Sequence, residues 1–137
     1  MMQITFEQYF GKWLGHKDAT DVREDNARKF LPMVNSLLLD AQAYGIVLGF
    51  NPATASGVSG TQYGGFRPQS CPEGAPNSSH KEGRGVDVYD PQNLLDDWLT
   101  DDILGAHGLY REHPDSTPHW CHLTDRAPKS GHRTFLP

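Results

Sequence analysis

The sequence predicts an α+β fold in which a small antiparallel sheet packs against helices. Three observations predict it: one long segment with apolar residues at helical spacing, short alternating segments in the second half, and turn-forming residues between them. The length of 137 residues fits one domain, residues 1–137. Fourteen glycines and ten prolines indicate a loop-rich chain, while an aromatic content of 10% indicates a true hydrophobic core.

The first predicted element is an amphipathic helix over about residues 21–44. Its apolar positions recur at steps of three and four: Ala27, Phe30, Leu31, Val34, Leu37, Leu38 and Ala41. Thr20 or Asp21 can cap the start, and Gly45 stands where helices commonly end. Pro32 should kink the helix or mark a restart. Residues 46–50 then have the composition of a short buried strand.

A long loop separates this first half from the next strand. Residues 51–79 are rich in Gly, Ser, Pro, Asn and Gln, and a loop of that length in a small domain is usually functional or mobile. Residues 85–89 then alternate, which predicts a strand with Val86 and Val88 on one face and Asp87 on the other.

A helix and a hairpin complete the predicted elements. Asp90 followed by proline favours a helix start, and the helix should end near Gly105 or Gly108. The sequence then predicts two strands, at residues 109–112 and 120–123, joined by a turn-forming segment. The remaining tail is polar.

Charge and composition exclude several classes of partner. Twelve basic against seventeen acidic residues give a net charge of −5, so no basic stripe is available for nucleic acid or for an anionic membrane. The longest wholly apolar run is residues 37–39, which excludes membrane insertion. Residues 1–15 lack the pattern of a secretory signal, and two cysteines are too few for a disulfide scaffold.

The candidate chemistry lies in two short segments. His80 and Asp87 are seven positions apart, and Gly83 between them allows a tight turn that brings imidazole and carboxylate together. His122 lies on a later predicted strand, sharing a face with Trp120. Two imidazoles, one carboxylate and an open fourth position are typical of catalytic zinc. Spacing alone leaves an alternative, in which the three side chains serve only as a loop hydrogen-bond donor, a turn or cap partner, and a partly buried ring.

Cys121 is adjacent to His122, so on the predicted strand its side chain points to the opposite face of the sheet. It therefore reads as a small core residue. Two alternatives are a Cys/His zinc site, which lacks an accompanying Cys-x-x-Cys, and a cysteine nucleophile with His119 or His122 as its base.

Several motifs in order carry a family resemblance. The Ser-x-His-x-x-Gly-x-x-x-Asp signature of the zinc peptidases related to D-Ala-D-Ala carboxypeptidases, hedgehog and lysostaphin is matched by Ser78, His80, Gly83 and Asp87. Residues 120–122 resemble the family's Trp-x-His motif, and residues 64–68 resemble its Ser-Gly-Phe/Trp-Arg-Pro block, with glycine in place of the serine. Within the superfamily, the chain resembles the D-Ala-D-Ala carboxypeptidase branch and its short phage and prophage members, including their tail at residues 128–137.

The resemblance implies a hedgehog/D-Ala-D-Ala-peptidase-like fold and a zinc-dependent peptidase. Zn²⁺ would be held by His80, Asp87 and His122, and a metal-activated water would cleave a peptide bond in peptidoglycan stem or cross-linking peptides. Carboxypeptidases and endopeptidases both occur among the relatives. Short members resemble phage lysis or tail-associated enzymes, so we expect a monomer located in the host cytoplasm before lysis or in the phage particle.

Hydrolysis also needs a general base near the metal. Relatives carry a Glu or Asp shortly before the last histidine, and Glu112, at the end of a predicted strand, is the favoured candidate. Asp115 and His119 are alternatives; His119 stands where several relatives place an acidic base.

Three further residues are candidates for substrate contact. Arg67 could bind a substrate carboxylate or the oxyanion that forms during hydrolysis, or could simply pair with a surface acid. Ser78 could contact the substrate or only start the turn, and Trp120 could form a wall of the cleft. Two other functions share the same ligands: a zinc-containing phage structural or wall-binding module without turnover, and an amidase acting on the sugar–peptide linkage.

Overall fold

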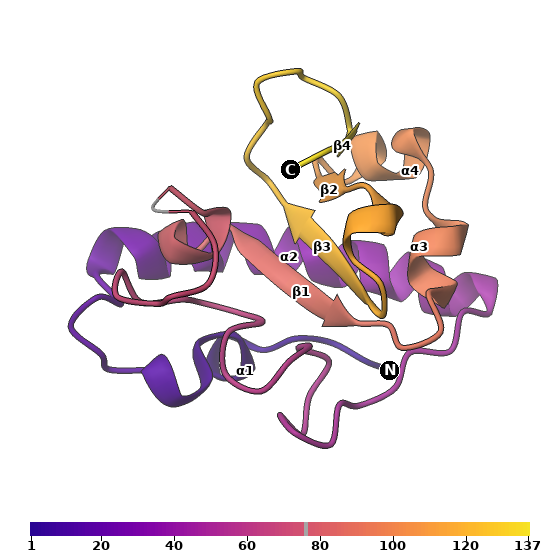
Figure 1. Cartoon of the computed structure of the whole chain (residues 1–137). Helices are drawn as coiled ribbons and strands as arrows, with labels where there is room; N and C mark the ends of the chain where they lie inside the picture. The colour runs from indigo at the N-terminus through magenta and orange to yellow at the C-terminus, as the bar shows by residue number, and fades with distance from the viewer. Residues whose placement is uncertain (76) are drawn as a thin grey trace.

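A long helix and a small sheet form the framework of the protein (Figure 1). The computed structural model describes residues 1–75 and 77–137. In chain order its elements are α1 (Phe6–Phe10), the 3₁₀ turn η1 (Gly11–Trp13), α2 (Asp21–Tyr44), η2 (Ser79–Glu82), β1 (Gly85–Tyr89), α3 (Leu94–Trp98), α4 (Asp101–Ala106), β2 (Tyr110–Glu112), η3 (Pro114–Ser116), β3 (Trp120–Thr124) and β4 (Thr134–Phe135). The predicted α+β class is confirmed.

The sheet has the strand order β1-β3-β2-β4 and is mixed. β3 pairs antiparallel with both β1 and β2, whereas β4 runs parallel to β2. The expectation of a wholly antiparallel sheet was therefore wrong. The tail returns beside β2, where the backbone N–H groups of Arg111 and His113 donate to the carbonyls of Arg133 and Phe135 at 2.8 and 2.7 Å.

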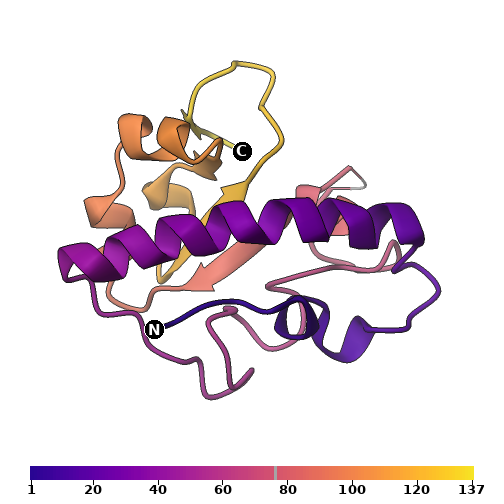
Figure 2. The same ribbon diagram turned by 180° about the vertical axis from the view of Figure 1, so that it is seen from behind.

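Helix α2 crosses the back of the sheet, as Figure 2 shows. Its predicted apolar residues are all buried, and they join Val86, Val88, Cys121 and Leu123 of the sheet in one hydrophobic cluster. The helix continues through Pro32 without the expected restart. Proline has no N–H to donate to the carbonyl four residues earlier, which here is that of Arg28. Pro32 and Arg28 are both on the exposed side of the helix, so water can replace the missing hydrogen bond.

The predicted strand at residues 46–50 is absent. This segment has no regular structure, and Val47 and Phe50 are 79% and 62% exposed. The edge of β1 is covered instead by the long loop, in which Val58 forms a bridge with Val88 and the Ser59 N–H donates to the Asp87 carbonyl at 2.8 Å. The apolar composition of residues 46–50 therefore did not identify the segment that covers the edge of β1.

The helix predicted after Asp90 is divided in two. Leu99 is extended, with ψ of 140°, and ends α3. Thr100 then caps α4, because its hydroxyl accepts a hydrogen bond from the Ile103 N–H at 3.2 Å. Asp90 does act as a cap, since its carboxylate accepts from the N–H groups of Leu95 and Asp96 at 3.1 Å each.

The N-terminal segment, for which the sequence predicts no element, contributes to the core. Ile4, Tyr9 and Phe10 are buried, and the Phe10 ring lies 5.0 Å from that of Phe66. The Tyr9 hydroxyl donates to the Gly85 carbonyl at 2.9 Å, which joins α1 to the start of β1. Among the described residues, no helix is both long and apolar enough to cross a bilayer.

Replacing Tyr9 by phenylalanine should lower the free energy of unfolding by about 1–2 kcal/mol, because the buried Gly85 carbonyl loses its donor. Chemical denaturation measures the change. The matched control is Tyr44→Phe, at a tyrosine that is 74% exposed, which should change the unfolding free energy by less than about 0.5 kcal/mol. Equal effects of the two substitutions would contradict the assigned role of the Tyr9 hydroxyl.

Candidate metal centre

Strand register brings two of the predicted ligands together. β1 and β3 pair antiparallel with Asp87 directly opposite His122. Successive side chains alternate between the faces of a strand, so this pair lies on the face opposite to Val86, Val88 and Cys121, which are buried in the core. One face of the sheet therefore packs against α2 and the other carries the polar site.

His80 reaches the same point from η2. The Ser78 hydroxyl accepts a hydrogen bond from the His80 N–H at 3.3 Å and begins this turn. Gly83 ends it in the left-handed region, with φ of 76°, and a Cβ there would lie 2.3 Å from the Arg23 carbonyl oxygen. Only glycine satisfies both conditions without strain, and the chain can then enter β1 with Asp87 close to His80.

The three side chains converge on one oxygen atom. Asp87 Oδ1 lies 2.9 Å from His122 Nδ1 and 3.2 Å from His80 Nε2. One ligand atom from each of the three residues lies within 4.8 Å of the others. Ligands about 2.0 Å from zinc at tetrahedral angles are about 3.3 Å apart, so the two distances from Asp87 Oδ1 match the ligand spacing of a zinc site. The three residues could hold a metal ion, as the sequence predicts.

The hydrogen bonding of His80 strengthens this interpretation. Its Nδ1 lies 2.8 Å from the Gly65 carbonyl oxygen, which can only accept, so Nδ1 carries the proton. In the neutral ring, Nε2 then presents a lone pair to the Asp87 carboxylate. Two electron-rich atoms at 3.2 Å repel each other unless a proton or a metal ion lies between them. A metal ion held by the three residues would remove this repulsion while leaving the imidazole neutral.

Electrostatics favours the protonation states that metal ligands require. Burial lowers the pKa of His80, which keeps the imidazole neutral. Burial by itself would raise the pKa of Asp87, but the His80 and His122 rings outweigh it when they are protonated, through their positive charge and their hydrogen bonds, and hold that pKa below its usual range. A neutral imidazole and an ionised carboxylate are the ligand forms. Two imidazoles and one carboxylate suit catalytic zinc, and also non-haem iron(II).

Arg67 supports the candidate metal ligand rather than standing free. Its Nη2 lies 3.3 Å from Asp87 Oδ2, and its Nε donates to the Tyr63 carbonyl at 2.7 Å. The side chain is only 11% exposed. Its partner is therefore the partly buried Asp87 in place of a surface acid, and Arg67 also lines the cavity over the candidate ligands, where its predicted contact with the substrate carboxylate or the oxyanion stays a prediction. Such partners of a metal ligand orient it and tune its affinity.

A cavity of about 490 Å³ opens over the three candidate ligands. Glu112, Ser78 and Trp120 line it, as expected for a base and two substrate contacts. Burial raises the pKa of Glu112. Ser78 also fulfils the turn role described above.

The other two candidate bases lie outside this cavity. The Asp115 side chain is 91% exposed and pairs with His113 at 3.7 Å. His119 is exposed, adopts φ of 78°, and places its Nδ1 3.1 Å from the Pro91 carbonyl oxygen. Of the three candidates, Glu112 alone shares the cavity with the ligands.

Cys121 is a core residue, as the alternation of side chains along the strand predicts. It is fully buried among the apolar residues, and its pKa is raised by burial and by the neighbouring Asp96. A thiolate is therefore disfavoured, which argues against the cysteine nucleophile and the Cys/His metal site.

Two parts of the site could not be predicted from the sequence. The Gly65 carbonyl fixes the tautomer of His80, and nothing in the sequence indicates that contact. The Phe135 ring lies 6.4 Å from the His122 ring, and Phe135 lines the cavity. Phe135 is the one aromatic residue of the predicted tail, but its position depends on the parallel pairing of β4.

Comparisons with protein-family models, with curated proteins and with solved structures found no match to this chain.

The purified protein should bind close to one zinc ion, and His80→Ala or His122→Ala should abolish that binding, because each removes one of three protein ligands. Elemental analysis after dialysis measures the stoichiometry. His132→Ala, at an exposed histidine outside the cavity, is the control and should retain the metal. Full zinc retention in both ligand variants would eliminate the proposed site.

Arg67→Lys should weaken zinc affinity by about tenfold or more, because lysine cannot hold Asp87 and the Tyr63 carbonyl with one planar fork. Competition with a chromogenic chelator measures the affinity. Arg84→Lys is the matched control, since Arg84 pairs with Asp125 at 2.7 Å and does not line the cavity. A similar affinity in both variants would show that Arg67 does not support the metal ligand.

Proposed function

We propose that the protein is a zinc-dependent peptidase that hydrolyses a peptide bond in peptidoglycan stem or cross-linking peptides. The observation that carries this proposal is the convergence of His80, Asp87 and His122 on one point, with Glu112 on the wall of the same cavity. A binding module needs the ligands alone. A hydrolase also needs a proton acceptor beside them, and Glu112 fits that additional role.

Each group has a defined task in the proposed reaction. His80, Asp87 and His122 would hold the zinc ion, which would lower the pKa of the attacking water and polarise the carbonyl oxygen. Glu112 accepts a proton from the attacking water as the new C–O bond forms, and passes it to the amine nitrogen as the C–N bond breaks. The burial that raises the pKa of Glu112 makes it a stronger base than an exposed carboxylate. Arg67 keeps the Asp87 carboxylate oriented throughout.

The substrate class rests on the motifs of the sequence. The Ser-x-His-x-x-Gly-x-x-x-Asp segment, the Trp-x-His segment and the Gly-Phe-Arg-Pro block occur in the order found in peptidases that act on bacterial cell walls. The location that fits these short relatives is the host cytoplasm before lysis or the phage particle. We propose these two locations for the protein, together with a zinc-peptidase fold and a monomeric state.

Glu112→Gln should retain zinc but lower kcat by at least about 10²-fold, because the amide cannot accept the proton. Steady-state kinetics and elemental analysis together test this. Asp115→Asn, which removes a neighbouring exposed carboxylate outside the cavity, is the control and should keep near-normal kcat. A Glu112→Gln protein with undiminished turnover would exclude Glu112 as the base.

Mass spectrometry of muropeptides released from defined peptidoglycan tests the reaction itself. A peptidase leaves new peptide termini within the stem or cross-link, whereas an amidase frees the N-terminal alanine from the sugar. Detection of that alanine as the only new terminus would favour the amidase. Intact peptidoglycan after incubation with the zinc-loaded protein would favour a structural or wall-binding module.

A further inference from the structure

The cavity over the candidate metal ligands has a neighbouring cavity with which it shares part of its wall. A second cavity of about 290 Å³ lies beside it and shares three wall residues with it: Arg67, Asp87 and Trp120. The rest of its wall comes chiefly from the loop between Ser59 and Tyr63, together with Glu73. Space for a ligand is therefore present on both sides of the wall that Arg67, Asp87 and Trp120 form.

The loop that forms this second wall is attached to the ligand-bearing strand. The Asp87 N–H donates to the Gly64 carbonyl at 2.7 Å, and the Asp87 carbonyl accepts from the Ser59 N–H at 2.8 Å. Both ends of the loop thus meet at the backbone of one residue. The position of the second cavity is consequently fixed relative to the Asp87 carboxylate.

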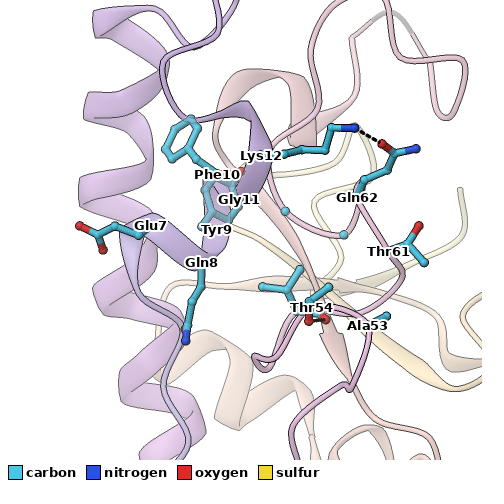
Figure 3. Close-up of a pocket in the computed structure, with 13 residues that line it drawn as sticks. Glu7, Gln8, Tyr9, Phe10, Gly11, Lys12, Ala53, Thr54, Thr61 and Gln62 are labelled. Carbon is cyan, nitrogen blue, oxygen red and sulfur yellow. Dashed lines mark hydrogen bonds between the residues drawn. The ribbon is translucent and has the colours of Figure 1, made fainter.

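The outer end of the same loop is held by η1. The Tyr63 ring stacks on Trp13 with centroids 5.9 Å apart and an interplanar angle of 8°. The Trp13 indole donates to the Gln62 carbonyl, and Lys12 donates to the Gln62 side chain, each at 2.8 Å. Figure 3 shows this Lys12–Gln62 contact beside a third cavity, on whose wall Thr61 also lies. The loop is a preorganised wall with contacts at both ends.

The cationic side chains along the two neighbouring cavities are already paired with acidic side chains. Among the described residues that line them, the arginine and lysine side chains are Arg67 and Arg126. Arg67 is bonded to Asp87, and Arg126 pairs with Glu82 at 2.9 Å while donating to the Asn77 carbonyl at 2.7 Å. Recognition of a terminal carboxylate needs an available cation. The second cavity instead presents the carboxylate of Glu73.

We propose that the substrate is a peptide that passes through the site, filling both cavities, so that the enzyme is an endopeptidase that cleaves internal bonds. This inference rests on the proposed peptidase function and specifies its substrate: a chain extended on both sides of the scissile bond, without a free end at the metal. Thr61 and Tyr63 form the wall against which the far segment of the substrate lies.

Two defined substrates test this inference with the zinc-loaded wild-type protein. One is a cross-linked peptidoglycan peptide dimer with acetylated amino and amidated carboxyl ends, and the other is a pentapeptide stem with a free carboxyl terminus. We expect internal cleavage of the blocked dimer with kcat/KM at least about tenfold above release of the terminal residue from the pentapeptide. Release of the terminal residue alone, with an inert dimer, would overturn the endopeptidase and leave the peptidase standing. Cleavage of neither substrate would refute both proposals.

A substitution that fills the second cavity provides an independent measurement. Thr61→Trp should raise KM for the blocked dimer by about tenfold while zinc stoichiometry stays at one, because Thr61 lies on the cavity wall away from the three ligands. Gln3→Trp places the same bulk on another exposed residue outside the cavities and should leave KM unchanged. An unchanged KM in a folded, zinc-loaded Thr61→Trp protein would contradict the through-passing substrate.

Discussion

Asp87 holds one carboxylate oxygen against two imidazole nitrogens and the other against a guanidinium group. A carboxylate that is 14% exposed must have its charge compensated, because desolvation would otherwise favour its neutral form. Arg67 compensates it on one side. On the other side, the proton on His80 Nδ1 leaves Nε2 facing the carboxylate, so the arrangement is balanced when a proton or a metal ion lies between them.

The surrounding fold is arranged to keep this carboxylate in place. Its strand is paired with β3 on one edge and with the Ser59 and Gly64 backbone on the other, and Tyr9 bonds to the first residue of the same strand. Alternation along β3 places Cys121 in the core and His122 in the site. Stability and chemistry thus occupy opposite faces of two adjacent strands, which allows the site to be polar without interrupting the core.

Local patterns made much of this predictable from sequence. The periodicity of α2, the alternation around Asp87 and the turn at Gly83 are encoded within a few residues of each other. Features that depend on distant contacts were not predictable. The parallel pairing of β4, the covering of β1 by Val58 and the contact from Arg67 to Asp87 each join segments whose meeting no local pattern specifies. The division between α3 and α4 did have a local cause in the Thr100 cap.

The most direct test of the account is a crystal structure of the zinc-loaded protein with an anomalous difference map at the zinc absorption edge. We predict one peak at about 2.0–2.2 Å from His80 Nε2, His122 Nδ1 and Asp87 Oδ1, with the fourth position open to the cavity that Glu112 lines. A zinc ion bound elsewhere, or the absence of any peak between these three side chains at saturating zinc, would contradict it.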